Sequence, residues 1–379
     1  MHVGLNLIYL VPGETGGTEV VARELLPALI AERPDTRFTL FVNREAAESG
    51  DGFFRDLAPA ITVPVRARRR VEWVRGEQQL LPGLARRARV DLVHSLANTG
   101  PTWGRFRRVV TIHDLIHRIH PEAHFGLRSV GMRILVSLAA RRSDRVIADS
   151  ESTRQDLVNM LGLGPGRIDV APLGLGTTQV TAPMPPAELR ARHRLGERRL
   201  LLTVSAKRPH KNLIRLLEAL ALIPADRRPV LLAPGYPTPY ERELERRARE
   251  LGVAEDVRLI GWIAGEELEG MYAAADCFVF PSLYEGFGMP VLEAMRRSVP
   301  VACSDRGSLR EVAGSAALLF DPESPASIAA GVEQVLSDRS LAEALRIAGR
   351  EQAARFTWQA TARATIESYE RALSPSSTA

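Results

Sequence analysis

Residues 277–293 read CFVFPSLYEGFGMPVLE, and this stretch contains the pattern that decides the fold. The apolar run 277–280 is typical of a buried strand, because parallel strands that are covered on both faces are apolar throughout. Gly286 and Gly288 favour a loop in which a ligand can approach the backbone, and Pro290 suits the first turn of a helix. The stretch therefore predicts a strand, a loop and a helix in succession.

The same unit recurs along the whole chain. Apolar runs of strand length alternate with amphipathic segments of helix length, which is the pattern of parallel α/β sheets. In the first half, strands are expected at residues 3–10, 38–42, 92–95, 109–112, 145–148 and 168–171. In the second half, strands are expected at residues 200–204, 230–233, 257–259, 277–280, 299–303 and 317–320. The predicted fold class is therefore α/β, with two doubly wound Rossmann-like domains.

A domain boundary is expected between Pro172 and Gly196, where glycines and prolines interrupt every periodic pattern. The two halves are expected to face each other across a cleft. The predicted organisation is a first domain at residues 1–175, a linker at 176–198, a second domain at 199–356 and a helix at 357–373 that packs back on the first domain.

The composition indicates a globular protein of the cytoplasm. Of 379 residues, 45% are hydrophobic and 25% are charged, which is close to the globular average. No apolar run reaches membrane-spanning length, since the candidate at 271–284 is interrupted by Asp276. The first residues lack the basic region and cleavage site of a secretory signal. Cys277 and Cys303 both lie in apolar runs, which favours free thiols in a reducing compartment.

The positive charge lies in the first half of the chain, mainly at residues 66–89, where arginines interleave with apolar residues. Such a segment can touch an anionic surface, which leaves open a peripheral contact with the inner face of the membrane. We favour the alternative, a solvated helix face whose apolar residues belong to the core. Nucleic acid is not expected as a partner, because no nucleic-acid-binding motif accompanies the charge.

Lysine usage is unusual, because only Lys207 and Lys211 occur among 50 basic residues. Both lie between the strand expected at 200–204 and a helix that begins near Leu213. Ligands of open α/β sheets bind beyond the carboxyl ends of the strands, where helix N-termini attract anions. The pair therefore predicts a phosphate site, and the alternative is two surface lysines clustered by chance.

Two glutamates flank the glycine-rich loop after residues 277–280. Glu285 lies in the loop and Glu293 lies early in the following helix. Both carboxylates are expected to face the cleft, where their oxygens can accept hydrogen bonds from the hydroxyls of a sugar and a ribose. Complementing the helix dipole is an alternative role for Glu293, but it does not explain Glu285.

The first half of the chain contributes weaker candidates. Gly16 and Gly17 lie in a turn that can bind phosphate or acceptor, although it lacks the dinucleotide and P-loop fingerprints. His113 follows the strand expected at 109–112, so its side chain can point into a cleft. The nearby histidines lack a glutamate partner, and the chain contains no Asp-x-Asp pair, so no metal and no cofactor are expected.

The stretch from Glu285 to Glu293 resembles the Glu-x7-Glu signature of retaining glycosyltransferases of family 4, which have the GT-B fold. Further stretches resemble motifs of that family in order and spacing. They are residues 16–19, 111–114, 149–150, 172–174, 210–212, 261–262 and 308–311.

The resemblance implies a role for each candidate residue. Glu285 is expected at the donor sugar hydroxyls, Glu293 at the ribose and Lys211 at the leaving diphosphate. His113 is expected against the transferred sugar. The other expected donor contacts are Gly16 and Gly17 at the phosphates, Trp262 and Ile263 at the nucleobase, and the backbone of Phe287, Gly288 and Met289 near the sugar.

The chain departs from the family at two points. Many members have Gly-Arg where this chain has Ser205 and Ala206, so Lys207 or Arg208 is expected to replace the arginine. A common glycine is replaced by Ser298, which we expect to alter only packing.

The resemblance implies a retaining glycosyltransferase, and the missing Asp-x-Asp pair favours a metal-independent one. It moves a hexose, with mannose favoured, from a GDP- or UDP-sugar to a hydroxyl of a glycan, lipid-linked or small-molecule natural-product acceptor. Two alternatives remain open: a nucleotide-sugar epimerase of related fold, and an inactive nucleotide-sugar-binding subunit. An NAD-dependent oxidoreductase fits less well, because the first turn lacks its fingerprint.

Overall fold

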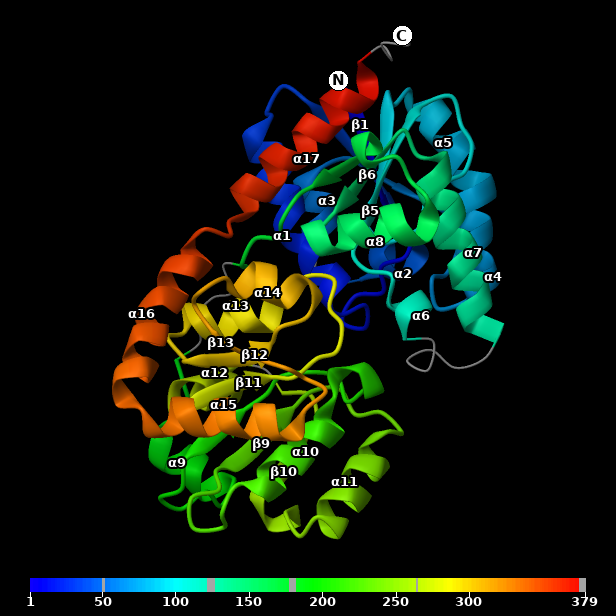
Figure 1. The fold of residues 1–379 in the computed structure, drawn as a ribbon. Helices are drawn as coiled ribbons and strands as arrows, with labels where there is room; N and C mark the ends of the chain where they lie inside the picture. The colour runs from blue at the N-terminus through cyan, green and yellow to red at the C-terminus, as the bar shows by residue number, and fades with distance from the viewer. Residues whose placement is uncertain (50–51, 121–126, 177–181, 264, 375–379) are drawn as a thin grey trace. The chain divides into compact units, whose positions relative to one another are not determined.

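The computed structural model describes residues 1–49, 52–120, 127–176, 182–263 and 265–374. The chain divides into two compact units (Figure 1). Unit 1 is Met1–Gly176 with Phe356–Ala379, and unit 2 is Thr177–Arg355. Residues 177–181 of the expected linker lie outside the described residues. Each unit contains a parallel sheet with helices, so the predicted α/β class is confirmed.

The described sheet of unit 1 has the strand order β3-β2-β1-β4-β5-β6-β7 and is parallel throughout. The strand order reverses between β1 and β4, which makes this the switch point where such sheets bind ligands. The strands are β1 (His2–Leu7), β2 (Arg37–Val42), β3 (Ala60–Thr62), β4 (Leu92–Ser95), β5 (Arg107–Ile112), β6 (Arg145–Ala148) and β7 (Ile168–Val170).

Strand β3 is the one strand of this sheet that the apolar pattern did not predict. It has three residues, lies at the edge and is partly exposed, so it leaves no apolar run in the sequence. The described helices of unit 1 are α1 (Gly17–Glu32), α2 (Arg44–Glu48), α3 (Phe53–Leu57), α4 (Arg70–Arg75), α5 (Leu81–Ala88), α6 (Ile116–Ile119), α7 (Leu127–Arg142), α8 (Glu151–Leu161) and α17 (Trp358–Leu373).

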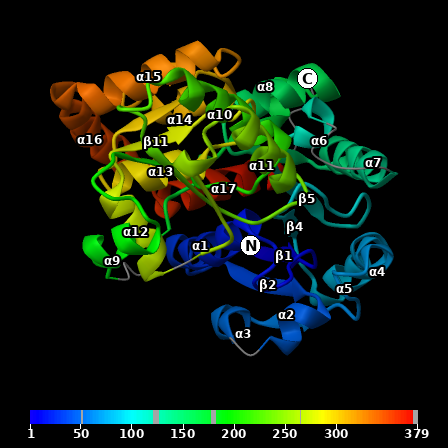
Figure 2. The same ribbon diagram turned by 90° about the horizontal axis from the view of Figure 1, so that it is seen from below.

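The last helix, α17, packs on unit 1 beside α1, as Figures 1 and 2 both show. Inside the unit, the Tyr369 hydroxyl lies 2.7 Å from Nδ1 of His94 on β4. The backbone of Gly174 runs so close to the start of α17 that a Cβ atom there would lie 2.3 Å from the Trp358 nitrogen. Glycine is therefore needed at residue 174 for this crossing.

The described sheet of unit 2 has the order β10-β9-β8-β11-β12-β13 and is also parallel. Its switch point lies between β8 and β11. The strands are β8 (Leu200–Leu202), β9 (Val230–Pro234), β10 (Val257–Ile260), β11 (Cys277–Phe280), β12 (Val301–Ser304) and β13 (Leu318–Phe320). The helices are α9 (Pro186–Arg192), α10 (Leu213–Leu222), α11 (Glu241–Glu250), α12 (Glu266–Ala274), α13 (Met289–Arg296), α14 (Gly307–Ala313), α15 (Pro325–Ser337) and α16 (Arg339–Ala354).

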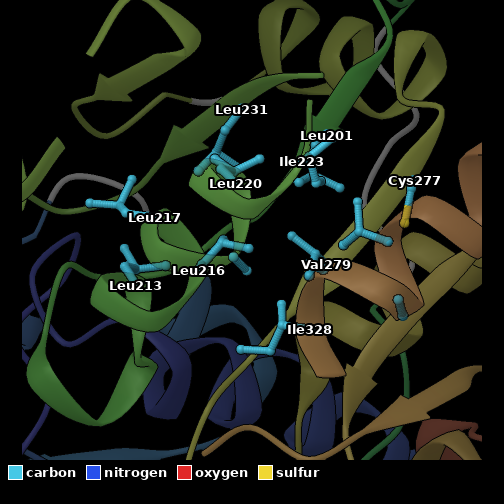
Figure 3. Close-up of a cluster of buried hydrophobic side chains, with 14 of the residues drawn as sticks. Leu201, Leu213, Leu216, Leu217, Leu220, Ile223, Leu231, Cys277, Val279 and Ile328 are labelled. Atoms are coloured by element: carbon cyan, nitrogen blue, oxygen red, sulfur yellow. The ribbon is translucent and has the colours of Figure 1, made fainter. Parts of the chain in front are cut away.

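The core of unit 2 holds β8 and β11 in place (Figure 3). Leu201 of β8, Val279 of β11 and Ile328 of α15 are buried together. Helix α10 contributes leucines at the i, i+3, i+4 and i+7 spacing of one helix face, and each buried leucine stabilises the unit by about 1.5–3 kcal/mol. They are Leu213, Leu216, Leu217 and Leu220. The core thereby fixes the two strand ends from which the loops of the candidate site begin.

The basic segment at 66–89 folds into α4, a π-helix at Gly76–Leu80 and α5. Of its apolar residues, Trp73, Leu81 and Ala85 are buried in the core of unit 1, as the core interpretation predicts, whereas Val71 is 84% exposed. Several of its arginines form ion pairs; they are Arg66 with Glu48, Arg68 with Glu14 and Arg69 with Glu72. Among the described residues, no helix combines the length and the apolar character that crossing a membrane requires.

Candidate active site

Two loops meet at the switch point of the sheet in unit 2. One follows β8 and leads into α10, and the other follows β11 and leads into α13. The Leu283 N–H donates to the His210 carbonyl at 2.9 Å. The Asn212 side chain donates to the carbonyls of Pro281 and Pro322, at 3.0 and 2.7 Å. Residues more than 60 positions apart in the sequence are thus tied into one rigid surface.

The central feature of this surface is an ion pair between Lys211 and Glu285. Lys211 Nζ lies 2.6 Å from Glu285 Oε1, and the side chains are only 16% and 13% exposed. The ammonium also lies 5.5 Å from the centre of the Phe280 ring. Because little water reaches the pair, its charges are weakly screened. The arrangement offers a cation for phosphate oxygens beside an acceptor for hydroxyl groups.

Helix α13 begins at Met289, four residues after Glu285 in the chain. Gly288 precedes the helix with φ 108°, and no side chain caps the helix. A Cβ atom at residue 288 would lie 2.6 Å from Leu309 Cδ2, so the position requires glycine. The Ser308 hydroxyl donates to the Glu285 carbonyl at 2.8 Å and fixes the loop. The partial positive charge at the start of α13 is therefore available to an anionic ligand.

Glu293 lies on α13 and contacts a different neighbour. The Tyr272 hydroxyl donates to Glu293 Oε2 at 3.3 Å. Burial raises the pKa of Tyr272 well above its ordinary value, and the negative charge of Glu293 adds to the shift. Among the described residues, no hydrogen bond joins Glu293 to Glu285 or to Lys211. That both carboxylates face one ligand stays a prediction.

The structure separates the two lysines. Lys207 is completely buried, and its Nζ donates to the carbonyls of Gly235 at 3.0 Å and Ile260 at 2.6 Å. Burial lowers the pKa of Lys207, and nearby Glu241 partly offsets this. Arg208 is exposed instead. Of the two residues expected to replace the family arginine, Arg208 is the one whose charge faces solvent.

Trp262 and Ile263 follow β10, and Trp262 is 59% exposed. Its ring stacks with that of Tyr236, with centroids 6.0 Å apart and an angle of 29° between the planes. Tyr236 was not among the residues expected from the sequence. It follows β9 just as Trp262 follows β10, and this shared position after neighbouring strands was the signal that could have revealed it.

In unit 1, Gly16 and Gly17 form the start of α1. Gly16 has φ 69°, a backbone conformation that glycine adopts readily. Apart from the adjoining residues and the backbone of α1 itself, no described atom lies within 4 Å of a Cβ atom built on either glycine, and no side chain caps the helix. The start of α1 is therefore open, as a site for a phosphate group requires.

His113 is held from both sides of its ring. Nδ1 lies 2.7 Å from Asp149 Oδ2, and Nε2 lies 2.7 Å from the Leu96 carbonyl. Burial lowers the pKa of His113, but Asp149 and the carbonyl outweigh it, so the pKa rises to about 9. At neutral pH both ring nitrogens therefore donate, and the imidazolium lies beside its carboxylate. The pKa of neighbouring His94 shifts in the opposite direction, because burial and the charge of His113 lower it to about 3.

The described residues contain no group of three or more histidine, cysteine, aspartate or glutamate side chains arranged to hold a metal ion. Both cysteines are free, and burial raises the pKa values of their thiols.

Two family models match most of the chain. The model described as Glycosyltransferase Family 4 matches residues 15–179, and the model described as Glycosyl transferases group 1 matches residues 187–352. O-antigen chain mannosyltransferase B of Escherichia coli is 33% identical over 271 residues, which are 70% of each chain. The chain belongs to glycosyltransferase family 4. As a member of this family it is a sugar-transferring enzyme, which confirms the class of activity expected from the resemblance.

Other similar proteins differ in length or in sequence. The serotype-specific mannosyltransferase WbdA of Escherichia coli is 29% identical to this family 4 chain over 287 residues. The match covers 72% of this chain and 34% of WbdA, so the chain spans about a third of that protein. Among solved structures, sucrose-phosphate synthase of Thermosynechococcus elongatus has a TM-score of 0.76 at 21% identity over 98% of both chains. This likeness supports the GT-B fold alone.

Proposed function

We propose that the chain is a retaining, metal-independent mannosyltransferase with GDP-mannose as its donor and a hydroxyl of a glycan as its acceptor, free or lipid-linked. The observation that carries the proposal is the shielded Lys211 and Glu285 pair at the switch point of unit 2, with 2.6 Å between Nζ and Oε1. Mannose is favoured because both relatives from Escherichia coli are named mannosyltransferases.

Binding of the donor breaks the ion pair between Lys211 and Glu285, and each of the two side chains then contacts the donor instead. A diphosphate next to the start of α13 gives the Lys211 ammonium an acceptor of higher charge than a single carboxylate. Glu285 then accepts hydrogen bonds from hydroxyls of the donor sugar, and exposed Arg208 adds positive charge at the diphosphate. Glu293 holds the ribose hydroxyls with one oxygen while Tyr272 fixes the other.

The reaction breaks the bond from the anomeric carbon to the diphosphate oxygen and forms a bond from that carbon to the acceptor oxygen. The proton of the acceptor hydroxyl passes to a diphosphate oxygen, so no covalent enzyme intermediate is needed. Lys211 and the start of α13 stabilise the negative charge that grows on the diphosphate. One such preorganised donor contributes about 2.7–4 kcal/mol in comparable sites.

Unit 1 supplies the other residues of the proposal. The open glycines at the start of α1, Gly16 and Gly17, lie near the donor phosphates. His113 lies against the transferred sugar, and its Nε2–H donates a hydrogen bond to a sugar hydroxyl oxygen in place of the Leu96 carbonyl. Because the imidazolium is fixed by Asp149, it orients the sugar and does not act as a base.

A peripheral membrane contact forms a separate part of the proposal. Arg75, Arg86 and Arg87 remain exposed on the basic segment, and Val71, one helical turn before Arg75 on α4, is 84% exposed. Exposed arginines next to an apolar side chain suit the surface of an anionic bilayer, where lipid-linked acceptors reside.

Donor consumption with and without acceptor tests the proposed activity. We expect GDP-mannose to be consumed rapidly only when a mannose-containing glycan is present, with GDP as the second product. Equal consumption without acceptor and recovery of an epimerised nucleotide sugar would show an epimerase. A rise in melting temperature without any consumption would show a binding subunit.

A further inference from the structure

Lys207 joins two neighbouring loops of unit 2 from the inside. Its Nζ donates to the Gly235 carbonyl at 3.0 Å and to the Ile260 carbonyl at 2.6 Å. Gly235 directly follows β9, and Ile260 is the last residue of β10. A single buried cation thus connects the carboxyl ends of adjacent strands.

The backbone is tightly packed around this lysine. The Gly235 N–H donates to the carbonyls of Ile260 and Gly261, each at 3.2 Å, and the Lys207 N–H donates to the Tyr236 carbonyl at 3.3 Å. A Cβ atom at residue 235 would lie 1.8 Å from the Ser205 carbonyl oxygen. The ends of β8, β9 and β10 therefore meet backbone to backbone, with Lys207 between them.

The surroundings of the ammonium are incompatible with simultaneous binding of phosphate. A buried ammonium is costly unless its donors are satisfied. Two donors of Lys207 meet carbonyl oxygens, and the Glu241 carboxylate lies 3.9 Å from Nζ. With an exposure of 0%, the side chain offers no donor to a ligand at the surface.

The two loops that Lys207 connects carry the exposed aromatic pair. Tyr236 is the residue after Gly235, and Trp262 comes two residues after Ile260. Their rings are stacked although the side chains are 44% and 59% exposed. Exposed aromatic side chains that lie together commonly meet a ligand, and every nucleobase presents a face for stacking.

The position of the pair suits a nucleobase. Lys211 follows β8, and Trp262 follows β10, which lies two strands away in the sheet. Two strand spacings place the ends of β8 and β10 about 10 Å apart, a distance that a ribose can bridge from a diphosphate to its base. A donor held at Lys211 therefore reaches the aromatic pair along the same edge of the sheet.

We infer that Lys207 is a positioning residue that holds Tyr236 and Trp262 as one aromatic surface, on which the nucleobase of the donor stacks. This inference rests on the proposed function, because Lys211 must hold the diphosphate. It assigns a base contact to Tyr236 and removes Lys207 from the phosphate ligands.

Calorimetry with GDP, UDP and inorganic diphosphate tests whether Lys207 positions the aromatic pair or binds phosphate directly. We expect Lys207→Met, Tyr236→Ala and Trp262→Ala each to weaken binding of GDP and UDP about tenfold or more, the order that loss of a base stack produces. Inorganic diphosphate should bind each variant as it binds the wild type. Trp103→Ala is the matched control, because Trp103 is 56% exposed and lies in unit 1.

The donor KM of Lys207→Met should rise by a larger factor than its kcat falls. Equal losses for inorganic diphosphate and GDP would make Lys207 a phosphate ligand and overturn the inference, and so would unchanged binding of all three ligands. If Lys207→Met fails to fold, the test uses nucleotide binding by Tyr236→Ala and Trp262→Ala. Both side chains are exposed, so we expect these two variants to fold. A wild-type chain that binds none of the ligands refutes the proposed function itself.

Discussion

Replacing Lys211 by methionine removes the cation of the ion pair and keeps most of the side-chain volume. In the wild type, Lys211 and Glu285 are 16% and 13% exposed, so the variant leaves a carboxylate without its partner in a shielded place. The loss of this interaction lowers the free energy of unfolding by about 1–3 kcal/mol. The loss of transition-state stabilisation is larger, about 2.7–4 kcal/mol, and corresponds to a fall in kcat of about 100- to 1,000-fold.

A second ion pair of the same unit provides the control. Arg228 lies 3.0 Å from Asp256, and both side chains are 14% exposed. Asp256 also pairs with Arg198 at 2.6 Å, so Arg228→Met should lose a comparable or smaller free energy of unfolding and keep wild-type kcat.

The assay follows GDP release at saturating GDP-mannose and acceptor, with urea unfolding of the same samples. The reasoning is refuted if Lys211→Met turns over at the wild-type rate, or if Arg228→Met loses as much activity as Lys211→Met.

Three further predictions concern stability and surface binding. The folded-state pKa of His113 is about 9 against an ordinary 6.5. The protonated ring therefore adds about 3 kcal/mol to the free energy of unfolding. This contribution is complete below pH 6.5 and is lost as the pH rises through 9. Urea unfolding of His113→Gln should show a weaker decline over this range, and parallel pH profiles would contradict the assignment. Gly174→Ala should destabilise unit 1 by about 1–3 kcal/mol, because its Cβ meets the Trp358 backbone. Gly164→Ala, with open space around it, should be neutral in the same melts, and equal effects would refute the packing argument. The chain should sediment with anionic vesicles at low salt and be released from them by added salt. The double variant Arg86→Glu with Arg87→Glu should bind these vesicles more weakly. Absence of sedimentation of the wild type would exclude the membrane contact.

Strand positions could be predicted because the strands of a covered parallel sheet are apolar throughout. The run that contains Cys277 and Phe280 coincides with β11, since burial on both faces leaves a signal in every residue. Strand β3 left no such signal, because an edge strand of three residues buries little.

The candidate site was predictable in place but not in detail. Lys211 and Glu285 were expected near the switch point, because each follows a strand on one side of it. The ion pair between them depends on loop conformations that no local pattern encodes.

Lys207 shows the same limit more clearly. Its sequence position resembles that of Lys211, yet its ammonium points inward to carbonyls at the carboxyl ends of two other strands. Likewise, the pKa of His113 depends on Asp149, which lies 36 residues away in the sequence.

The most direct test of the central claim is a crystal structure of the chain with GDP bound. We predict that a diphosphate oxygen lies within hydrogen-bond distance of Lys211 Nζ at the start of α13, with the Lys211 to Glu285 distance lengthened from 2.6 Å. A nucleotide bound elsewhere, with this ion pair unchanged, would contradict the account.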